Sequence, residues 1–359
     1  MGQDEAHGPV ALTCRSIGFA RQSAKIVLIN PWRMKYLFAQ TGLIKCALTV
    51  IFRDKVSVTQ FHSITGRYLL MKPGFWMFLI LVFVAQLGHA ASIAAGNQVQ
   101  NVTLDDKEFK VYTYRPVDCS PKAFLMVFHG TNRNADTYRD VARPLADKLC
   151  LIVVAPRFTK WDFPPSHYQY GGMTNWHGGV LPIEEWSGQY AMKLVAWVRR
   201  TEGNSDMPYY FIGHSAGAQF LSRLAVIPNQ AQRIVVVNPS TWVLPTTKVD
   251  APFGLGGIPD AENVLKRYLA EPIVVMLGQE DEGSFELDVS PRAMDQGANR
   301  HERGERAFAM AQAEAKAHGW PCNWKLIEVP GVGHSAGKMF SSTQAVDALN
   351  LALPVEGHP

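Results

Sequence analysis

The chain has 359 residues, of which 47% are hydrophobic and 18% are charged, so it can bury a large core and is not a mostly disordered protein. Its formal net charge of +4 is unevenly distributed, because residues 1–72 hold ten basic and three acidic side chains while the rest of the chain is mildly acidic. A nucleic-acid partner is not expected, since it would need a basic surface on the folded part.

Residues 71–91 have the pattern of a secretory signal peptide. Lys72 supplies the positive charge, and residues 75–87 form an apolar run that is shorter than a typical membrane span. The small residues that follow suit cleavage after Ala90 or Ala91. A buried helix is the alternative interpretation of this run. The pattern predicts a periplasmic or secreted protein with no stable membrane partner once the signal is removed.

Two explanations remain open for the residues that precede this segment. Signal peptides begin at or near the initiating methionine, and Met71 stands at the start of this one. In the first explanation, which we favour, Met71 is the true start and residues 1–70 belong to an over-extended reading frame. In the second, residues 1–70 form a cytoplasmic tail ahead of a signal anchor. Either way, we expect one catalytic domain over residues 92–359.

From about residue 97 the pattern predicts strands that alternate with helices. Residues 99–104 and 109–114 alternate apolar and polar side chains around an Asp-Asp-Lys turn, which indicates an antiparallel hairpin. Short, continuously apolar runs follow, as is typical of parallel strands that are buried on both faces. These runs are 123–128, 151–155, 209–212, 234–237, 273–277 and 324–329. The expected helices are 135–149, 183–200, 215–226, 303–318 and 342–352. This order predicts an α/β fold with a doubly wound, mostly parallel sheet.

The segment Gly213-His214-Ser215-Ala216-Gly217 follows one of these strands directly and opens a helix. A G-x-S-x-G sequence in that context is typical of a nucleophile elbow, although the bare pattern also occurs by chance. The tight turn strains the backbone of Ser215, so the residues two positions away must be small. The serine hydroxyl then lies at a helix N-terminus, where the helix dipole favours developing negative charge.

A serine nucleophile needs a base and an acid, which follow in the chain order serine, acid, histidine in this architecture. His334 lies in the loop after the last strand, and this position favours it over the other histidines. The side chain of His214, inside the elbow, is expected to point away from the target of Ser215. Asp281 follows the strand 273–277 and is predicted to orient the imidazole. Its neighbours Glu280 and Glu282 remain alternatives.

Two backbone N–H groups are expected to stabilise the oxyanion. Ala216 supplies one, and Thr131, in the loop after strand 123–128, is assigned the other because Gly130 lets the backbone turn close to a substrate. Trp176 and Trp242 are candidate substrate contacts, with anchoring of loops to the core as an equal alternative. The sequence contains no phosphate-binding loop and no metal-ligand pattern, so neither a cofactor nor a metal is expected.

Cys119 and Cys150 precede two strands that we expect to be neighbours, at the same end of the sheet. A disulfide would suit an exported protein. Two buried free thiols are the alternative, and the sequence leaves both open.

Together these motifs resemble the α/β-hydrolase superfamily, and more narrowly the bacterial serine hydrolases related to poly(3-hydroxybutyrate) depolymerases and feruloyl or acetyl-xylan esterases. The segments that carry the narrower resemblance are 128–130, 213–220, 238–242, 252–255, 277–281 and 296–300. It covers most of residues 105–340 and implies that Ser215, Asp281 and His334 form the triad. Secreted depolymerases of that group often have a cysteine beside the oxyanion glycine and a polymer-binding module. This chain has Thr131 there and shows no extra domain, so the resemblance leaves open whether the ester is polymeric.

The sequence therefore predicts a carboxylic-ester hydrolase that forms an acyl-enzyme on Ser215 and acts on a small-molecule or oligomeric ester. Two alternatives remain. One is a serine peptidase or amidase with the same machinery. The other is a non-catalytic binding protein that retains the fold.

Overall fold

The computed structural model describes residues 92–350. The predicted signal segment 71–91, the preceding residues 1–70 and residues 351–359 lie outside this part, so the predictions made for them stay predictions. Within residues 92–350, no helix is both long enough and apolar enough to span a bilayer.

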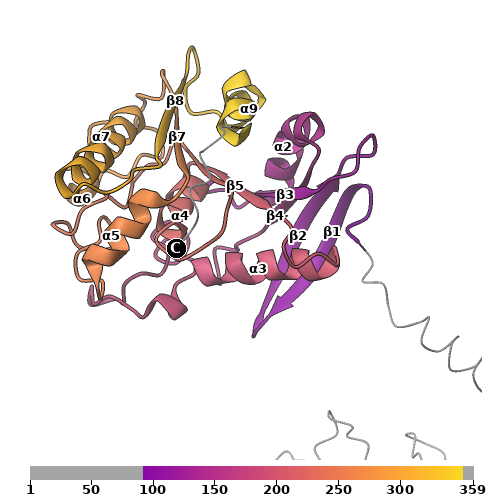
Figure 1. Ribbon diagram of the computed structural model, residues 1–359, viewed down its shortest axis with the longest axis horizontal. Helices are drawn as coiled ribbons and strands as arrows, with labels where there is room; N and C mark the ends of the chain where they lie inside the picture. The colour runs from indigo at the N-terminus through magenta and orange to yellow at the C-terminus, as the bar shows by residue number, and fades with distance from the viewer. Residues whose placement is uncertain (1–91, 351–359) are drawn as a thin grey trace, which may run out of the picture. The chain divides into compact units, whose positions relative to one another are not determined.

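Within the described residues, eight strands form one sheet in the order β1-β2-β4-β3-β5-β6-β7-β8 (Figure 1). The strands are β1 (Gly96–Leu104), β2 (Lys107–Arg115), β3 (Ala123–Phe128), β4 (Leu151–Pro156), β5 (Tyr209–His214), β6 (Arg233–Val237), β7 (Ile273–Gly278) and β8 (Lys325–Val329). β1 and β2 form an antiparallel hairpin, β2 runs antiparallel to β4, and β3 to β8 are parallel to one another. The predicted fold class and all eight predicted strands are confirmed.

Helices cover both faces of the sheet (Figure 1). They are α2 (Ala135–Leu149), α3 (Gly188–Thr201), α4 (Ala216–Leu224), α5 (Ala261–Ala270), α6 (Pro291–Met294), α7 (Arg300–His318), α8 (Ala336–Ser341) and α9 (Thr343–Asn350). Successive strand residues face opposite layers, as the pleat requires. Val127 packs in the cluster formed with α2, α8 and α9, whereas Phe128 packs in the cluster formed with α3, α4, α5 and α7.

Two helical predictions need correction. The helix expected over 183–200 is divided into a short 3-10 turn, Ile183–Glu185, and α3. Trp186 lies between them in extended conformation, and its buried indole donates a hydrogen bond to the Leu181 carbonyl over 2.9 Å. α5 was not predicted at all. It begins after Asp260, which is left-handed and provides no side-chain cap, so packing of the helix on the sheet stabilises it in place of a local start signal.

The chain reverses its winding direction at β3. From β3 it passes through α2 outward to β4, and then returns through α3 to β5 on the other side of β3. In open α/β sheets, ligands bind beyond the carboxyl ends of the strands at such a switch point. The loop after β3 and the turn between β5 and α4 meet there.

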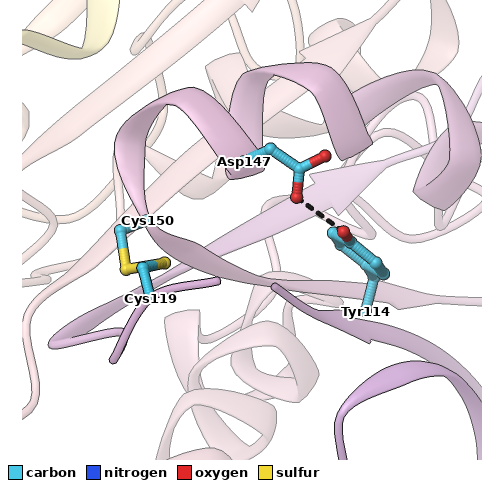
Figure 2. Close-up of a disulfide and its surroundings, with 4 residues drawn as sticks. All are labelled: Tyr114, Cys119, Asp147 and Cys150. Carbon is cyan, nitrogen blue, oxygen red and sulfur yellow. Dashed lines mark hydrogen bonds between the residues drawn. A yellow bond between two sulfur atoms is a disulfide. The ribbon is translucent and has the colours of Figure 1, made fainter. Parts of the chain in front are cut away.

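A disulfide joins Cys119 to Cys150, which resolves the alternative left open by the sequence (Figure 2). Cys150 caps the C-terminus of α2 in a left-handed conformation with φ of 52°, directly before β4. Beside it, the Tyr114 hydroxyl donates a hydrogen bond to Asp147 over 2.5 Å (Figure 2). This hydrogen bond, helped by burial, raises the pKa of Tyr114. The hairpin, α2 and the start of β4 are therefore linked covalently and by hydrogen bonding.

We expect replacement of both Cys119 and Cys150 by serine to lower the free energy of unfolding by about 3–4 kcal/mol. The disulfide closes a loop between residues that are 31 positions apart and so removes conformational entropy from the unfolded chain, which the double variant regains. Urea unfolding of the double variant measures this loss. Cys322→Ser, which changes the half-buried free cysteine, is the matched control and should have a much smaller effect. Equal unfolding curves for the wild type with and without reductant would contradict the expectation.

Candidate active site

Ser215 stands between β5 and α4 in a strained backbone conformation, with φ of 58° and ψ of −120°. A Cβ atom added to Gly213 would lie 2.6 Å from the backbone carbon of Gly217, and one added to Gly217 would lie 2.2 Å from the carbonyl oxygen of Phe128. The predicted need for small residues on both sides of the serine therefore has a direct physical cause. The Ser215 N–H is itself bonded to the Val237 carbonyl over 3.0 Å, which ties the turn to β6.

The structure brings Ser215, His334 and Asp281 into one hydrogen-bonded chain. His334 Nε2 lies 3.0 Å from Ser215 Oγ, and His334 Nδ1 lies 2.7 Å from Asp281 Oδ2. Asp281 is 1% exposed, whereas the His334 side chain is 22% exposed. Of the three neighbouring acids considered from the sequence, Asp281 is the one whose carboxylate reaches the imidazole. A hydroxyl, an imidazole and a buried carboxylate in this order form the arrangement that activates a serine.

The acid loop after β7 and the histidine loop after β8 are held together by close backbone contacts. A Cβ atom on Gly278 would lie 2.3 Å from the Val332 carbonyl oxygen, and the Glu280 N–H donates to that same carbonyl over 3.0 Å. Asn238, fully buried at the end of β6, accepts from the Gly278 N–H over 2.8 Å and donates to the Gly333 carbonyl over 3.4 Å. These contacts fix the separation between Asp281 and His334.

Arg300, at the start of α7, holds the acid loop from behind. Its guanidinium lies 3.5 Å from the Asp281 carboxylate and donates to the carbonyls of Gly283 and Phe285 over 3.3 and 2.7 Å. The side chain is 1% exposed, and this burial lowers the pKa of Arg300 while Asp281 opposes the effect. The role of Arg300 was missed from sequence. The one signal was its place in segment 296–300, which carries part of the resemblance.

The two predicted oxyanion donors, Thr131 and Ala216, line the same cavity as Ser215, and within residues 92–350 neither of their N–H groups donates a hydrogen bond to another group. The Gly130 carbonyl accepts from His129 Nδ1 over 3.0 Å and from the Arg133 N–H over 3.2 Å. In a trans peptide the C=O of one residue and the N–H of the next point in opposite directions. Fixing the Gly130 carbonyl therefore also fixes the direction of the Thr131 N–H.

His129 makes this restraint as a neutral ring. Its Nε2 accepts a hydrogen bond from the Phe158 N–H over 3.0 Å, so the proton is on Nδ1. The ring is fully buried, and burial lowers its pKa to about 3. This role of His129 was not predicted, although its segment 128–130 carries part of the resemblance.

His214 does not point away as expected. Its ring lines the same cavity as Ser215, and the centroids of the His214 and His334 rings are 4.5 Å apart. The Tyr138 hydroxyl and His214 Nδ1 share a hydrogen bond of 3.1 Å, and Nε2 has no partner among the described residues. Burial lowers the pKa of His214 well below 6.5, and the neighbouring His334 lowers it further. A second, neutral histidine thus flanks His334.

Two cavities meet at Ser215, with volumes of about 460 and 290 Å³. The larger extends past Tyr138 and His214 toward α8, and the smaller extends past Gln219 and Tyr170. Such volumes suit small or oligomeric ligands.

Neither tryptophan that was considered as a substrate contact lines these cavities. Trp242 is fully buried, with its ring centroid 6.1 Å from that of Trp324, so its side chain has no surface to offer a substrate and its assignment is corrected to a core residue. Trp176 is 88% exposed and stays a prediction that no contact in the described part of the chain supports.

One group of potential metal ligands lies apart from the cavities. His301 and Glu305 on α7 and Glu328 on β8 place their ligand atoms within 4.8 Å of one another. The His301 nitrogens already face the two carboxylates, Nε2 at 2.7 Å from Glu328 and Nδ1 at 3.5 Å from Glu305. Hydrogen bonding accounts for this geometry, and the sequence expectation of no metal stays a prediction.

Comparison with solved structures gives close matches across the described fold. LpqC, a poly(3-hydroxybutyrate) depolymerase from Bordetella parapertussis, is 30% identical with a TM-score of 0.67, and the match covers 73% of this chain and 94% of that one. Poly(aspartic acid) hydrolase-1 from Sphingomonas sp. KT-1 is 31% identical with a TM-score of 0.67, and the match covers 70% and 98%. No protein-family model and no curated protein matched the chain. The sheet order and the serine elbow are those of a hydrolase fold. The chain belongs to the α/β-hydrolase superfamily, as its motifs predicted.

The buried His129 should make stability depend on pH. Its pKa is about 3 in the folded state and about 6.5 in the unfolded chain, so the two states bind protons equally above pH 6.5. Below pH 6.5 the unfolded chain alone takes up the proton, and this group should cost about 1.4 kcal/mol of stability per pH unit until pH approaches 3.

Urea unfolding at pH 7.5 and pH 5.5 measures this loss. His129→Gln should lose less stability than the wild type between these two pH values, by about 1.4 kcal/mol. His177→Gln, at an exposed position, should behave as the wild type. The same pH-dependent loss in His129→Gln and in the wild type would show that His129 is not the group responsible.

Proposed function

We propose that this protein is a serine hydrolase that cleaves carboxylic esters through an acyl-enzyme on Ser215. The observation that carries the proposal is the hydrogen-bonded chain from Ser215 through His334 to the buried Asp281, located where two cavities meet. The similarity to hydrolytic enzymes at about 30% identity supports hydrolysis in general.

In the proposed reaction, Ser215 Oγ attacks the ester carbonyl carbon while His334 Nε2 takes the hydroxyl proton. Negative charge develops on the carbonyl oxygen, which faces the N–H groups of Thr131 and Ala216. When the C–O bond to the leaving alcohol breaks, His334 returns the proton to that oxygen. Water then attacks the acyl carbon while His334 Nε2 takes its proton. When the bond between the acyl carbon and Ser215 Oγ breaks, His334 returns that proton to Ser215 Oγ and the carboxylic acid leaves.

We propose an ester rather than an amide as the substrate because poly(3-hydroxybutyrate), the polymer in the name of LpqC, is a polyester. An amide substrate is the second candidate, and it is supported by the likeness to poly(aspartic acid) hydrolase-1, since poly(aspartic acid) is linked by amide bonds. Matched p-nitrophenyl esters and p-nitroanilides with the same acyl group separate the two, and faster release from the anilides at equal concentration would favour the amide.

A fluorophosphonate probe should label the wild-type protein, because an activated serine attacks its phosphorus. Ser215→Ala should abolish labelling, and Asp281→Asn should lower ester turnover by roughly 10³- to 10⁴-fold, since the imidazole loses the partner that fixes its tautomer. Ser205→Ala, which removes an exposed serine, is the control and should leave both signals unchanged. Equal labelling of the wild type and Ser215→Ala would falsify the assignment of the nucleophile.

Export to the periplasm or the medium belongs to the same proposal. The disulfide between Cys119 and Cys150 supports an oxidising compartment, independently of the signal pattern at 71–91. Mass spectrometry of the protein recovered from its native host should find a mature chain that begins at Ala91 or Ser92. Peptides from residues 1–70 in the mature protein would contradict cleavage there.

A further inference from the structure

Glu286 occupies an unusual place beside the nucleophile. Among the described residues, Thr131, Ser215 and Glu286 are the three that line both cavities. The first is the proposed oxyanion donor and the second the proposed nucleophile. The third places a carboxylate on the wall that both parts of a bound substrate would share.

The fold does not use this carboxylate. Within residues 92–350, the Glu286 side chain has no hydrogen-bond or ion-pair partner, and it is exposed. Its backbone has φ of 52°, a left-handed conformation that costs energy in a residue other than glycine. A negative charge near the reacting carbonyl also opposes the oxyanion. Both costs point to an interaction that Glu286 makes with a substrate.

Arg300 interacts with the charge of Glu286 at longer range, but no ion pair joins the two side chains in the described part of the chain. Arg300 is the one Lys or Arg side chain among the described lining residues, and its guanidinium is already bound to Asp281 and to two carbonyls. Asp288 adds further negative charge. Burial raises its pKa, but hydrogen bonds from Tyr170 and Ser290 outweigh this and leave the pKa lowered. A bound substrate therefore meets an acidic wall.

We propose that Glu286 selects substrates by charge. Esters that carry a positively charged nitrogen near the scissile bond are favoured over neutral esters, and neutral esters over those that carry a carboxylate there. The inference rests on the proposed ester hydrolysis and names the substrate class of the same site. Because poly(aspartic acid) has a carboxylate in every unit, it should be a poor substrate for this chain.

Three thioacetates of similar size test the proposal, with the released thiol as the signal. They are acetylthiocholine, its neutral isostere with a quaternary carbon in place of the nitrogen, and the thioacetate of mercaptopropanoate. For the wild type, kcat/KM should fall in that order after correction for each thioester's rate of hydrolysis by hydroxide. Glu286→Gln should reduce the cation-to-anion ratio of kcat/KM by about tenfold, as expected for one charge several Å from the substrate charge in a partly solvated site.

Glu282→Gln is the matched control. Glu282 is an exposed carboxylate on the same loop, but it lines neither cavity. It should keep the wild-type ratio. Added salt should shrink the ratio of the wild type and leave that of Glu286→Gln nearly unchanged. These variants lie on an exposed loop, and labelling by the neutral fluorophosphonate reports whether Ser215 remains reactive in each.

The outcomes separate the two proposals. If the probe labels Ser215 and the neutral thioester is hydrolysed, but Glu286→Gln keeps the wild-type charge ratio, the charge-selection proposal is overturned and the hydrolase proposal stands. If the wild type hydrolyses the anionic thioester as fast as the neutral one, the charge-selection proposal is likewise overturned and the hydrolase proposal stands. If Ser215 is neither labelled nor needed for turnover, both proposals fall.

Discussion

The contact between the start of α4 and the end of β3 sets the geometry of the site. The Phe128 carbonyl lies where a side chain on residue 217 would begin, so helix and strand touch through backbone alone. This approach places Ser215 beside the turn that begins with His129 and contains Thr131. The nucleophile and its proposed oxyanion donor are therefore positioned by one contact. A methyl group at residue 217 would move them apart even though it lies outside the cavities.

The remaining site residues depend on buried polar groups that each connect two or more loops. Asn238 connects the ends of β6 and β7 to the histidine loop, Arg300 holds the acid loop, and His129 fixes the turn after β3. An isolated buried charge such as Arg300 would be costly, because desolvation exceeds what one distant ion pair returns. The two terminal nitrogens of Arg300 donate to carbonyls and lie near Asp281, while its Nε has no partner among the described residues. The bonds to the carbonyls fix the loop that carries Asp281 and leads to Glu286. The desolvation of Arg300 thus costs free energy at a place where its contacts fix the loop that carries Asp281.

Sequence patterns predicted the strands well because the inner parallel strands are buried on both faces and nearly continuously apolar, as in β6 and β7, whereas the edge strand β8 is only partly buried. The Ser215, Asp281 and His334 juxtaposition was predictable because each residue follows a recognisable strand. α5 was missed although Asp260 and Glu262 are residue types typical of a helix start, and the Asp260 side chain makes no capping bond. For Trp242 the sequence left substrate contact and anchoring to the core open, because an aromatic residue in a loop sequence gives no sign of burial. Arg300 and His129 act through contacts with other segments of the chain, and Glu286 is singled out by its place on the wall of both cavities, neither of which a local pattern encodes.

The three histidines of the site differ in burial and in hydrogen-bond partners. His129 and His214 are buried, and burial lowers the pKa of both, so neither accepts a proton readily. His334 is partly exposed and bonded to a buried carboxylate. The rings of His214 and His334 are 4.5 Å apart, and in the proposed reaction the proton taken from Ser215 goes to His334, which lies between the serine oxygen and Asp281. The neutral ring of His214 fills the space beside it without competing for that proton, and a charged side chain at residue 214 would repel the imidazolium on which the proposed reaction depends.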